Sequence, residues 1–327
     1  MRKARIFVTL IVINILLLLL NICIGSVGFF LADVMVNDTY MRIVMDIRLP
    51  RALSALLLGG ALSLSGFLLQ TFFHNPIAGP FVLGISSGAK MVVAIIMVFM
   101  TGMGYFASSL CLIAGAFVGA LLSMGFVLIL SRKTGNMGML IVAGVMIGYI
   151  CSAITDIVIT FANDADIVNL HSWSRGSFSG MTWDGVLICL IFVSITFILV
   201  FMLSKPLNAY RMGDSYALSL GVDVRRLRIE IIVLSGLLSA VIVAFAGPIS
   251  FVGVAAPHIT KKMLGTGEPV IMIPACFLTG GAFCLLSDLI ARTVCAPTEL
   301  SISTVTAIFG VPVVLMVMLE KRRGGLE

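Results

Sequence analysis

The stretch from residue 48 to residue 89 reads RLPRALSALLLGGALSLSGFLLQTFFHNPIAGPFVLGISSGA. Between residues 52 and 73 it contains no charged side chain, and about 20 apolar residues are enough for a helix to cross the hydrocarbon core of a membrane. Pro76 and Pro80 follow directly and interrupt the helical pattern. A backbone break at membrane depth survives only where protein or a water-filled cavity satisfies its polar groups. The stretch therefore predicts a spanning helix followed by a break inside a larger protein bundle.

The same pattern extends along the whole chain. Of the 327 residues, 60% are hydrophobic and 11% are charged, whereas a soluble domain carries roughly 25% charged residues. This composition excludes a water-soluble fold. The apolar runs predict an all-α, multi-pass membrane protein of about ten spans, at residues 6–32, 52–73, 82–100, 108–130, 138–162, 185–204, 229–247, a short 252–264, 270–291 and 303–320.

The basic residues indicate an orientation in the membrane. They lie in short clusters between the apolar runs and form no continuous basic face, which argues against a nucleic-acid partner. If the N-terminus is cytoplasmic, fifteen of the 21 Lys and Arg residues lie in inside segments and five in outside segments. Because inside loops are enriched in Lys and Arg, we expect both termini to be cytoplasmic.

The longest inside connection, residues 205–228, reads KPLNAYRMGDSYALSLGVDVRRLR. It predicts a short helix that is capped by Asp214 or Ser215 and ends at Gly221. A capped helix with an apolar face is typical of a docking surface for a soluble partner. A simple basic tether between two spans is the alternative.

Several kinds of chemistry are absent from the sequence. It contains no GxxxxGK[ST], HExxH or GxSxG motif, and its seven cysteines form no CxxC pair, so we expect no catalytic site, cofactor or metal.

The carboxylates in the apolar runs are few. Asp156 is placed near the outer end of its span, as is Asp288, which could pair with Arg292 at i, i+4 spacing. Because an ion-driven carrier needs carboxylates at membrane depth, we expect the energy source to lie on another chain, and a secondary carrier is the alternative.

Ordered motifs connect the chain with a known family. They are RLPR at 48–51, the glycine-rich run ending in LLQ at 68–70, NPIAGP at 75–80, GISSGA at 84–89, then Trp173, Gly176, Ser177 and Trp183, GPISFVGVAAPH at 247–258 and AIFGVP at 307–312. In this order they resemble the FecCD family of ABC-importer permeases, which serves iron-siderophore, haem and cobalamin uptake. Ser301 and Ser303 stand where Pro and Gly are usual, so the geometry at the start of the tenth span is in question.

The resemblance implies one transmembrane domain, residues 1–327, with an inverted repeat in which spans two to five match spans seven to ten. It implies a bacterial cytoplasmic-membrane homodimer with its pore between the copies. The expected partners are membrane lipid, a separate ABC ATPase subunit and an extracytoplasmic substrate-binding protein. Iron-siderophore is the first choice of cargo, with haem and cobalamin as alternatives.

The resemblance also implies roles for individual residues. Arg48 and Arg51 flank Leu49 and Pro50 just outside the second span, so we expect their guanidiniums to face the aqueous exterior. Together with Arg292 they correspond to arginines that receive carboxylates of the binding protein, although anchoring at the membrane interface is an alternative role. Residues 205–228 correspond to the loop that couples to the ATPase, with contacts at Gly213, Asp214, Ser215, Leu220, Gly221, Val222, Arg225 and Arg226. From loop position, we expect the cytoplasmic gate near Met137 and Gly138.

Overall fold

The computed structural model describes residues 2–25, 38–105, 108–133 and 137–323. Regular structure in these ranges is entirely helical. The long helices are α1 (Arg2–Cys23), α4 (Leu49–Phe72), α5 (Ile85–Gly102), α6 (Ser109–Lys133), α7 (Met137–Thr160), α9 (Trp183–Met202), α12 (Val224–Ala246), α14 (Pro269–Thr293) and α15 (Ile302–Arg323). The short ones are α3 (Asp38–Arg42), η1 (Ile43–Arg48), η2 (Pro80–Leu83), α8 (Asp164–Ser174), α10 (Ser204–Arg211), α11 (Asp214–Ser219) and α13 (Val252–Leu264).

Each of the ten predicted spans coincides with one of these helices. Within the described residues, eight helices are long and apolar enough to cross a membrane, and α15 has a shorter apolar segment, Ile302–Met316. Helix α13 has 13 residues, which at 1.5 Å per residue is about 20 Å and too short to cross alone. The predicted boundary of the first span was wrong, because its helix ends at Cys23, and residues 26–37 lie outside the described ranges.

The packing follows the predicted inverted repeat. Helix α4, the first of its half, packs along α14, the third of the other half, and α12 packs in the same way along α6. Each half also contains a backbone break, at residues 73–84 and 247–251, with one non-glycine residue at positive φ: His74 at 48° and Phe251 at 64°. In each half, therefore, the first helix packs against the third helix of the other half.

Small residues allow the central helices to approach closely. A Cβ atom added to Gly66 of α4 would overlap the backbone carbonyl group of Gly253 in α13. The residue before it, Ser65, donates a hydrogen bond from its hydroxyl to the Ser235 carbonyl oxygen of α12 at 2.9 Å. Lipid supplies no hydrophobic drive for helix association, so such close backbone contact and interhelical hydrogen bonds hold the bundle together.

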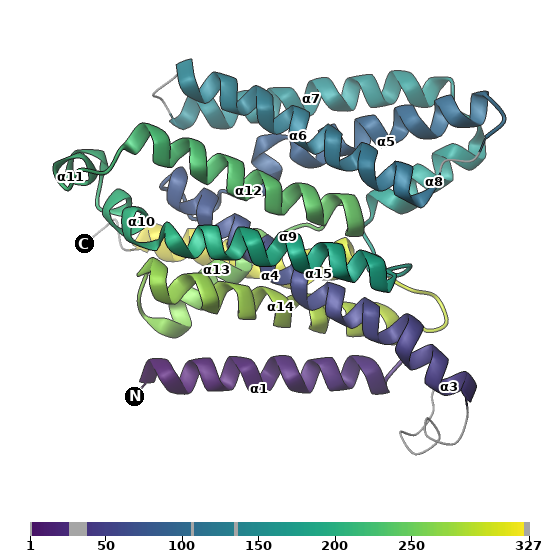
Figure 1. Cartoon of the computed structure of the whole chain (residues 1–327), viewed down its shortest axis with the longest axis horizontal. Coiled ribbons are helices and arrows are strands. Elements are labelled where there is room, and N and C mark those ends of the chain that lie inside the picture. Colours follow the sequence, from purple (N-terminus) through teal and green to yellow (C-terminus); the bar gives the residue numbers. More distant parts are fainter. Residues whose placement is uncertain (1, 26–37, 106–107, 134–136, 324–327) are drawn as a thin grey trace.

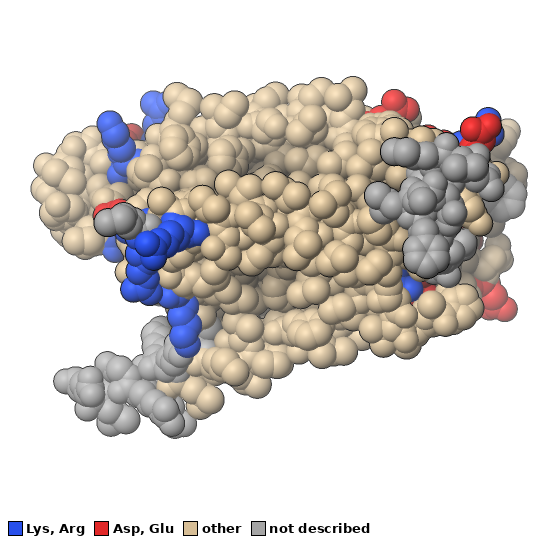
Figure 2. Space-filling model, turned by 90° about the horizontal axis from the view of Figure 1, so that it is seen from below, with Lys and Arg blue, Asp and Glu red and all other residues tan. Residues whose placement is uncertain are grey.

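The two ends of the bundle differ in charge (Figures 1 and 2). The start of α1 and the short helices α10 and α11 lie at one end, whereas α3 and α8 lie at the other. In Figure 2 most of the visible Lys and Arg side chains gather at the end that carries α11, and most of the visible Asp and Glu side chains at the opposite end. We call these ends the basic end and the distal end.

Candidate functional site

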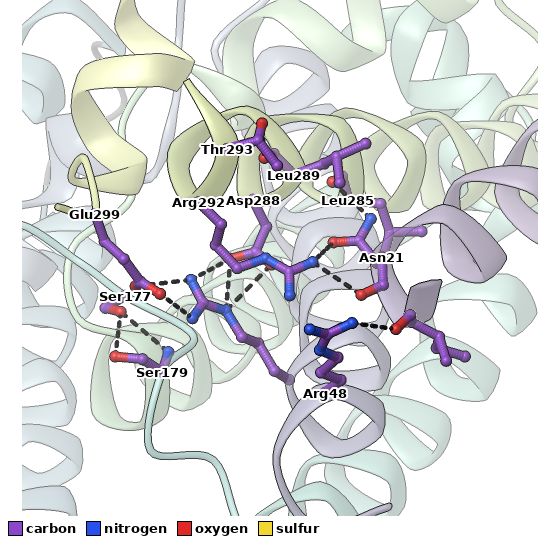
Figure 3. A network of polar contacts seen from close by, with 12 residues as sticks. Asn21, Arg48, Ser177, Ser179, Leu285, Asp288, Leu289, Arg292, Thr293 and Glu299 are labelled. Atoms are coloured by element: carbon purple, nitrogen blue, oxygen red, sulfur yellow. Dashed lines mark hydrogen bonds and ion pairs between the residues drawn. The ribbon is translucent and has the colours of Figure 1, made fainter. Parts of the chain in front are cut away.

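Three arginines meet near the distal end, where α1 stops, α4 starts and α14 approaches its last turn (Figure 3). Arg48 closes η1, and Arg51 lies in the first turn of α4, which also holds Pro50. Proline is well tolerated in a first turn because the amide that it lacks has no intrahelical partner there. Arg292 comes from α14. These residues, with Asn21, Asp288 and Glu299, are called the arginine cluster.

Arg51 makes the densest set of contacts in the cluster. Its Nε donates to both carboxylate oxygens of Asp288, at 3.0 and 3.2 Å. Its Nη1 and Nη2 donate to the two carboxylate oxygens of Glu299, at 2.9 and 3.1 Å. A planar guanidinium is suited to such two-pronged pairing, which fixes direction as well as charge.

The other two arginines tie α1 to the same place. Nε of Arg292 lies 3.2 Å from Asp288 Oδ2, but the N–H is not aligned for a hydrogen bond, so the pair is an ion pair only. Nη2 of Arg292 donates to the backbone and side-chain oxygens of Asn21. Arg48 Nη1 donates to the carbonyl oxygens of Ile22 and Cys23 at 2.9 and 3.0 Å, which are otherwise unpaired at a helix C-terminus.

Burial of the cluster corrects one expectation. We expected the guanidiniums of Arg48 and Arg51 to face the solvent, yet the two residues are 4% and 6% exposed and Arg292 is 4% exposed. Asp288 is fully buried, and its predicted pairing with Arg292 is confirmed. The side chain of Glu299 is 39% exposed, so it is the accessible carboxylate of the cluster. Three guanidiniums and two carboxylates leave one positive charge.

Sequence reasoning missed Asn21 and Glu299. Asn21 contacts Arg292 across 271 positions of sequence, and Glu299 contacts Arg51 across 248. An asparagine inside an apolar run is a signal that could have found the first, because a polar side chain at membrane depth needs a partner. Glu299 lies in the connection between α14 and α15 and had no such signal.

The loop motifs meet beside the cluster. Gly176, at φ 71°, lies so close to Pro248 that a Cβ atom would come within 2.6 Å of the Pro248 carbonyl oxygen. The Ser303 hydroxyl donates to that same oxygen at 2.6 Å. Ser303 therefore connects the start of α15 to the break before α13. Although Ser303 departs from the family pattern, α15 is a regular helix that begins at Ile302.

At the basic end the predicted coupling loop forms two short helices. Helix α11 starts at Asp214 and Gly221 follows its end at φ 76°, as predicted, but its N-cap residue is Gly213 and no side chain caps it, so the predicted capping role of Asp214 or Ser215 is wrong. Asp214 instead pairs with Arg228 of α12. Helix α10 was not predicted. The predicted coupling contacts lie in α11 or near its ends: Gly213, Asp214, Ser215, Leu220, Gly221, Val222, Arg225 and Arg226. Their role in coupling stays a prediction.

The predicted gate residues lie at the start of α7. Met137 is its first residue and is half-buried, and Gly138 is exposed. Residues 134–136, the rest of that connection, lie outside the described ranges. Further along α7, Asp156 is exposed. The gate therefore stays a prediction.

Comparison with known proteins places the chain in a family. The model of the FecCD transport family matches residues 11–320. The vitamin B12 import system permease protein BtuC of Shigella boydii is 35% identical over 315 residues, which cover 95% of this chain and 94% of BtuC. The hemin transport system permease protein HmuU of Yersinia pestis is 33% identical over 287 residues, which cover 88% and 86%. A solved metal-chelate type ABC transporter in an inward-facing conformation superposes with a TM-score of 0.87 at 27% identity over 97% of this chain and 99% of that one. The chain is therefore a member of the FecCD transport family.

Proposed function

We propose that this chain is the membrane-spanning permease subunit of an ATP-driven importer for metal chelates. The family match over residues 11–320 carries the proposal, and the likeness to a metal-chelate transporter over 97% of the chain supports it. The similar permeases are named for vitamin B12 and hemin. The cargo we propose is accordingly a chelated metal of the size of a siderophore, haem or cobalamin.

We infer that ATP is hydrolysed by a separate subunit docked at the basic end. The sequence has no P-loop motif with which to bind ATP itself. Around α11, Tyr216, Leu218 and Leu220 are 49%, 61% and 59% exposed, and Arg225 and Arg226 next to them are exposed as well. Apolar side chains beside arginines are the composition expected of a protein contact outside the membrane.

A second copy of this chain is the partner we propose for α7. The outward face of this helix is mainly apolar, with Met146, Tyr149 and Ile150 exposed, but Ser152 and Asp156 are exposed as well. A carboxylate facing lipid is costly, whereas one lining a water-filled pathway is not. A pore between two α7 helices accounts for both kinds of residue.

The orientation we propose has the basic end and both termini in the cytoplasm of a bacterium, since Lys and Arg concentrate on the cytoplasmic side. The arginine cluster then lies near the outer surface. A carboxylate of a binding protein could reach Arg51 by taking the place of Glu299, the accessible partner of that guanidinium. In this proposal, docking replaces the Glu299 carboxylate at Arg51 with a carboxylate of the binding protein.

Uptake by a reconstituted complex tests the function. Proteoliposomes containing the permease, its ATPase and its binding protein are given radiolabelled ferric siderophore, haem or cobalamin, with and without ATP inside. We expect one chelate to accumulate with ATP and to stop when the ATPase is inactivated. Uptake that needs no ATP and collapses with an ionophore would show an ion-driven carrier. If no chelate moves, the cargo class is wrong.

A further inference from the structure

A cavity of about 440 Å³ opens at the basic end of the bundle. It lies between the last turn of α4, the break that follows it, the end of α10, α13 and the start of α14. Its volume is within the range of small-molecule sites. The lining residues that matter here are Arg211, Lys261, His74 and His258 on the polar side, and Phe67 and Met272 on the apolar side.

In the part of the chain that the structure describes, the two permanent cations of this cavity lack a hydrogen-bonded counter-ion. No carboxylate there forms a hydrogen bond or an ion pair within 4 Å with Arg211 or Lys261. Partial burial lowers the pKa of Arg211, and the charge of Glu268 offsets only part of that shift. Glu268 itself lies 3.5 Å from the ammonium of Lys3. The guanidinium is thus partly buried, and Glu268 acts on it without a direct contact.

Two histidines are further polar groups of the cavity. His74 is held at φ 48° with its Nε2 3.4 Å from the Tyr210 carbonyl oxygen, and His258 faces the same cavity from α13. Like charges gathered in a partly buried space repel one another, and a bound anion removes that repulsion. A guanidinium and an ammonium that line one cavity offer both the planar and the point-charge contact that phosphate oxygens accept in proteins.

We propose that this cavity binds a phosphate group, either as free phosphate or as the headgroup of an anionic phospholipid. The apolar wall formed by Phe67 and Met272 is compatible with both sources. Arg211 ends α10 and lies two residues before Gly213, the first of the predicted coupling contacts. An occupied cavity would hold α10 to α13 and α14 and so steady the surface on which the ATPase is proposed to dock. The binding site itself does not depend on the proposed function.

Binding to the purified full-length chain in detergent tests the proposal. Inorganic phosphate is titrated by calorimetry, and phosphatidylglycerol is titrated by native mass spectrometry with phosphatidylcholine as the neutral comparison. The test variant is Arg211→Gln/Lys261→Gln. The matched control is Arg5→Gln/Lys205→Gln, which removes the same charge from exposed positions outside the cavity lining.

We expect the wild type and the control to bind phosphate, phosphatidylglycerol or both, and the test variant to bind about tenfold more weakly or worse. Phosphate binding alone assigns the site to a free anion, and selective phosphatidylglycerol binding assigns it to a lipid headgroup. Failure to bind either probe, equal affinity in test and control variants, or equal retention of phosphatidylcholine overturns the proposal. If the double variant does not fold, Lys261→Gln alone, at an exposed position, is compared with Lys205→Gln on the same criteria.

Discussion

Replacing Asp288 with asparagine is the strongest perturbation of the arginine cluster. Asp288 is fully buried and accepts hydrogen bonds from Arg51 Nε at 3.0 and 3.2 Å, and it also lies 3.2 Å from Arg292 Nε. Asn keeps the shape of the side chain but removes the charge that compensates these two guanidiniums. Removing one partner from a buried ion pair destabilises a protein by about 3–5 kcal/mol. We expect Asp288→Asn to lower the free energy of unfolding by that amount.

The measurement is a denaturant titration of the purified protein in detergent, followed by circular dichroism. Glu299→Gln is the matched control, because it also removes a carboxylate from Arg51 but at a position 39% exposed to solvent. Water can replace much of that interaction, so we expect a loss of about 1 kcal/mol. Equal losses for the two variants would refute the reasoning that burial of Asp288 sets its contribution.

Two further predictions concern docking and helix packing. Glu299→Gln removes the negative charge that competes for Arg51, so it should tighten binding of the substrate-binding protein. The measurement is surface plasmon resonance on the complex in nanodiscs. Unchanged or weaker binding would leave the cluster with only a structural role. Gly66→Ala places a methyl group against the Gly253 carbonyl group and should lower the free energy of unfolding by about 1–3 kcal/mol. Gly125→Ala, whose Cβ would have no neighbour within 4 Å, should not, and equal losses would contradict the packing.

Much of the architecture could be predicted from the sequence because the membrane imposes simple rules on it. A helix that crosses lipid must be apolar over a fixed length, so the runs at 52–73 and 229–247 were placed as spans, and α4 and α12 are found there. The end of a short helix at Gly221 was predicted as well, and Gly221 follows α11 with φ 76°. Helices α8 and α10 could not be predicted in the same way, because short helices outside the lipid have no required length or hydropathy.

The spans, the break after α4 and the family can all be inferred from contiguous residues of the sequence. The roles of the charged residues depend on the fold. Arg51 looked like a solvent-facing arginine until the fold brought Asp288 and Glu299 to it across more than 230 positions. The fold brings Arg211 and Lys261 to the lining of one cavity in the same way. The physical reason is that burial and charge pairing depend on distances between distant segments, and no local pattern encodes those distances.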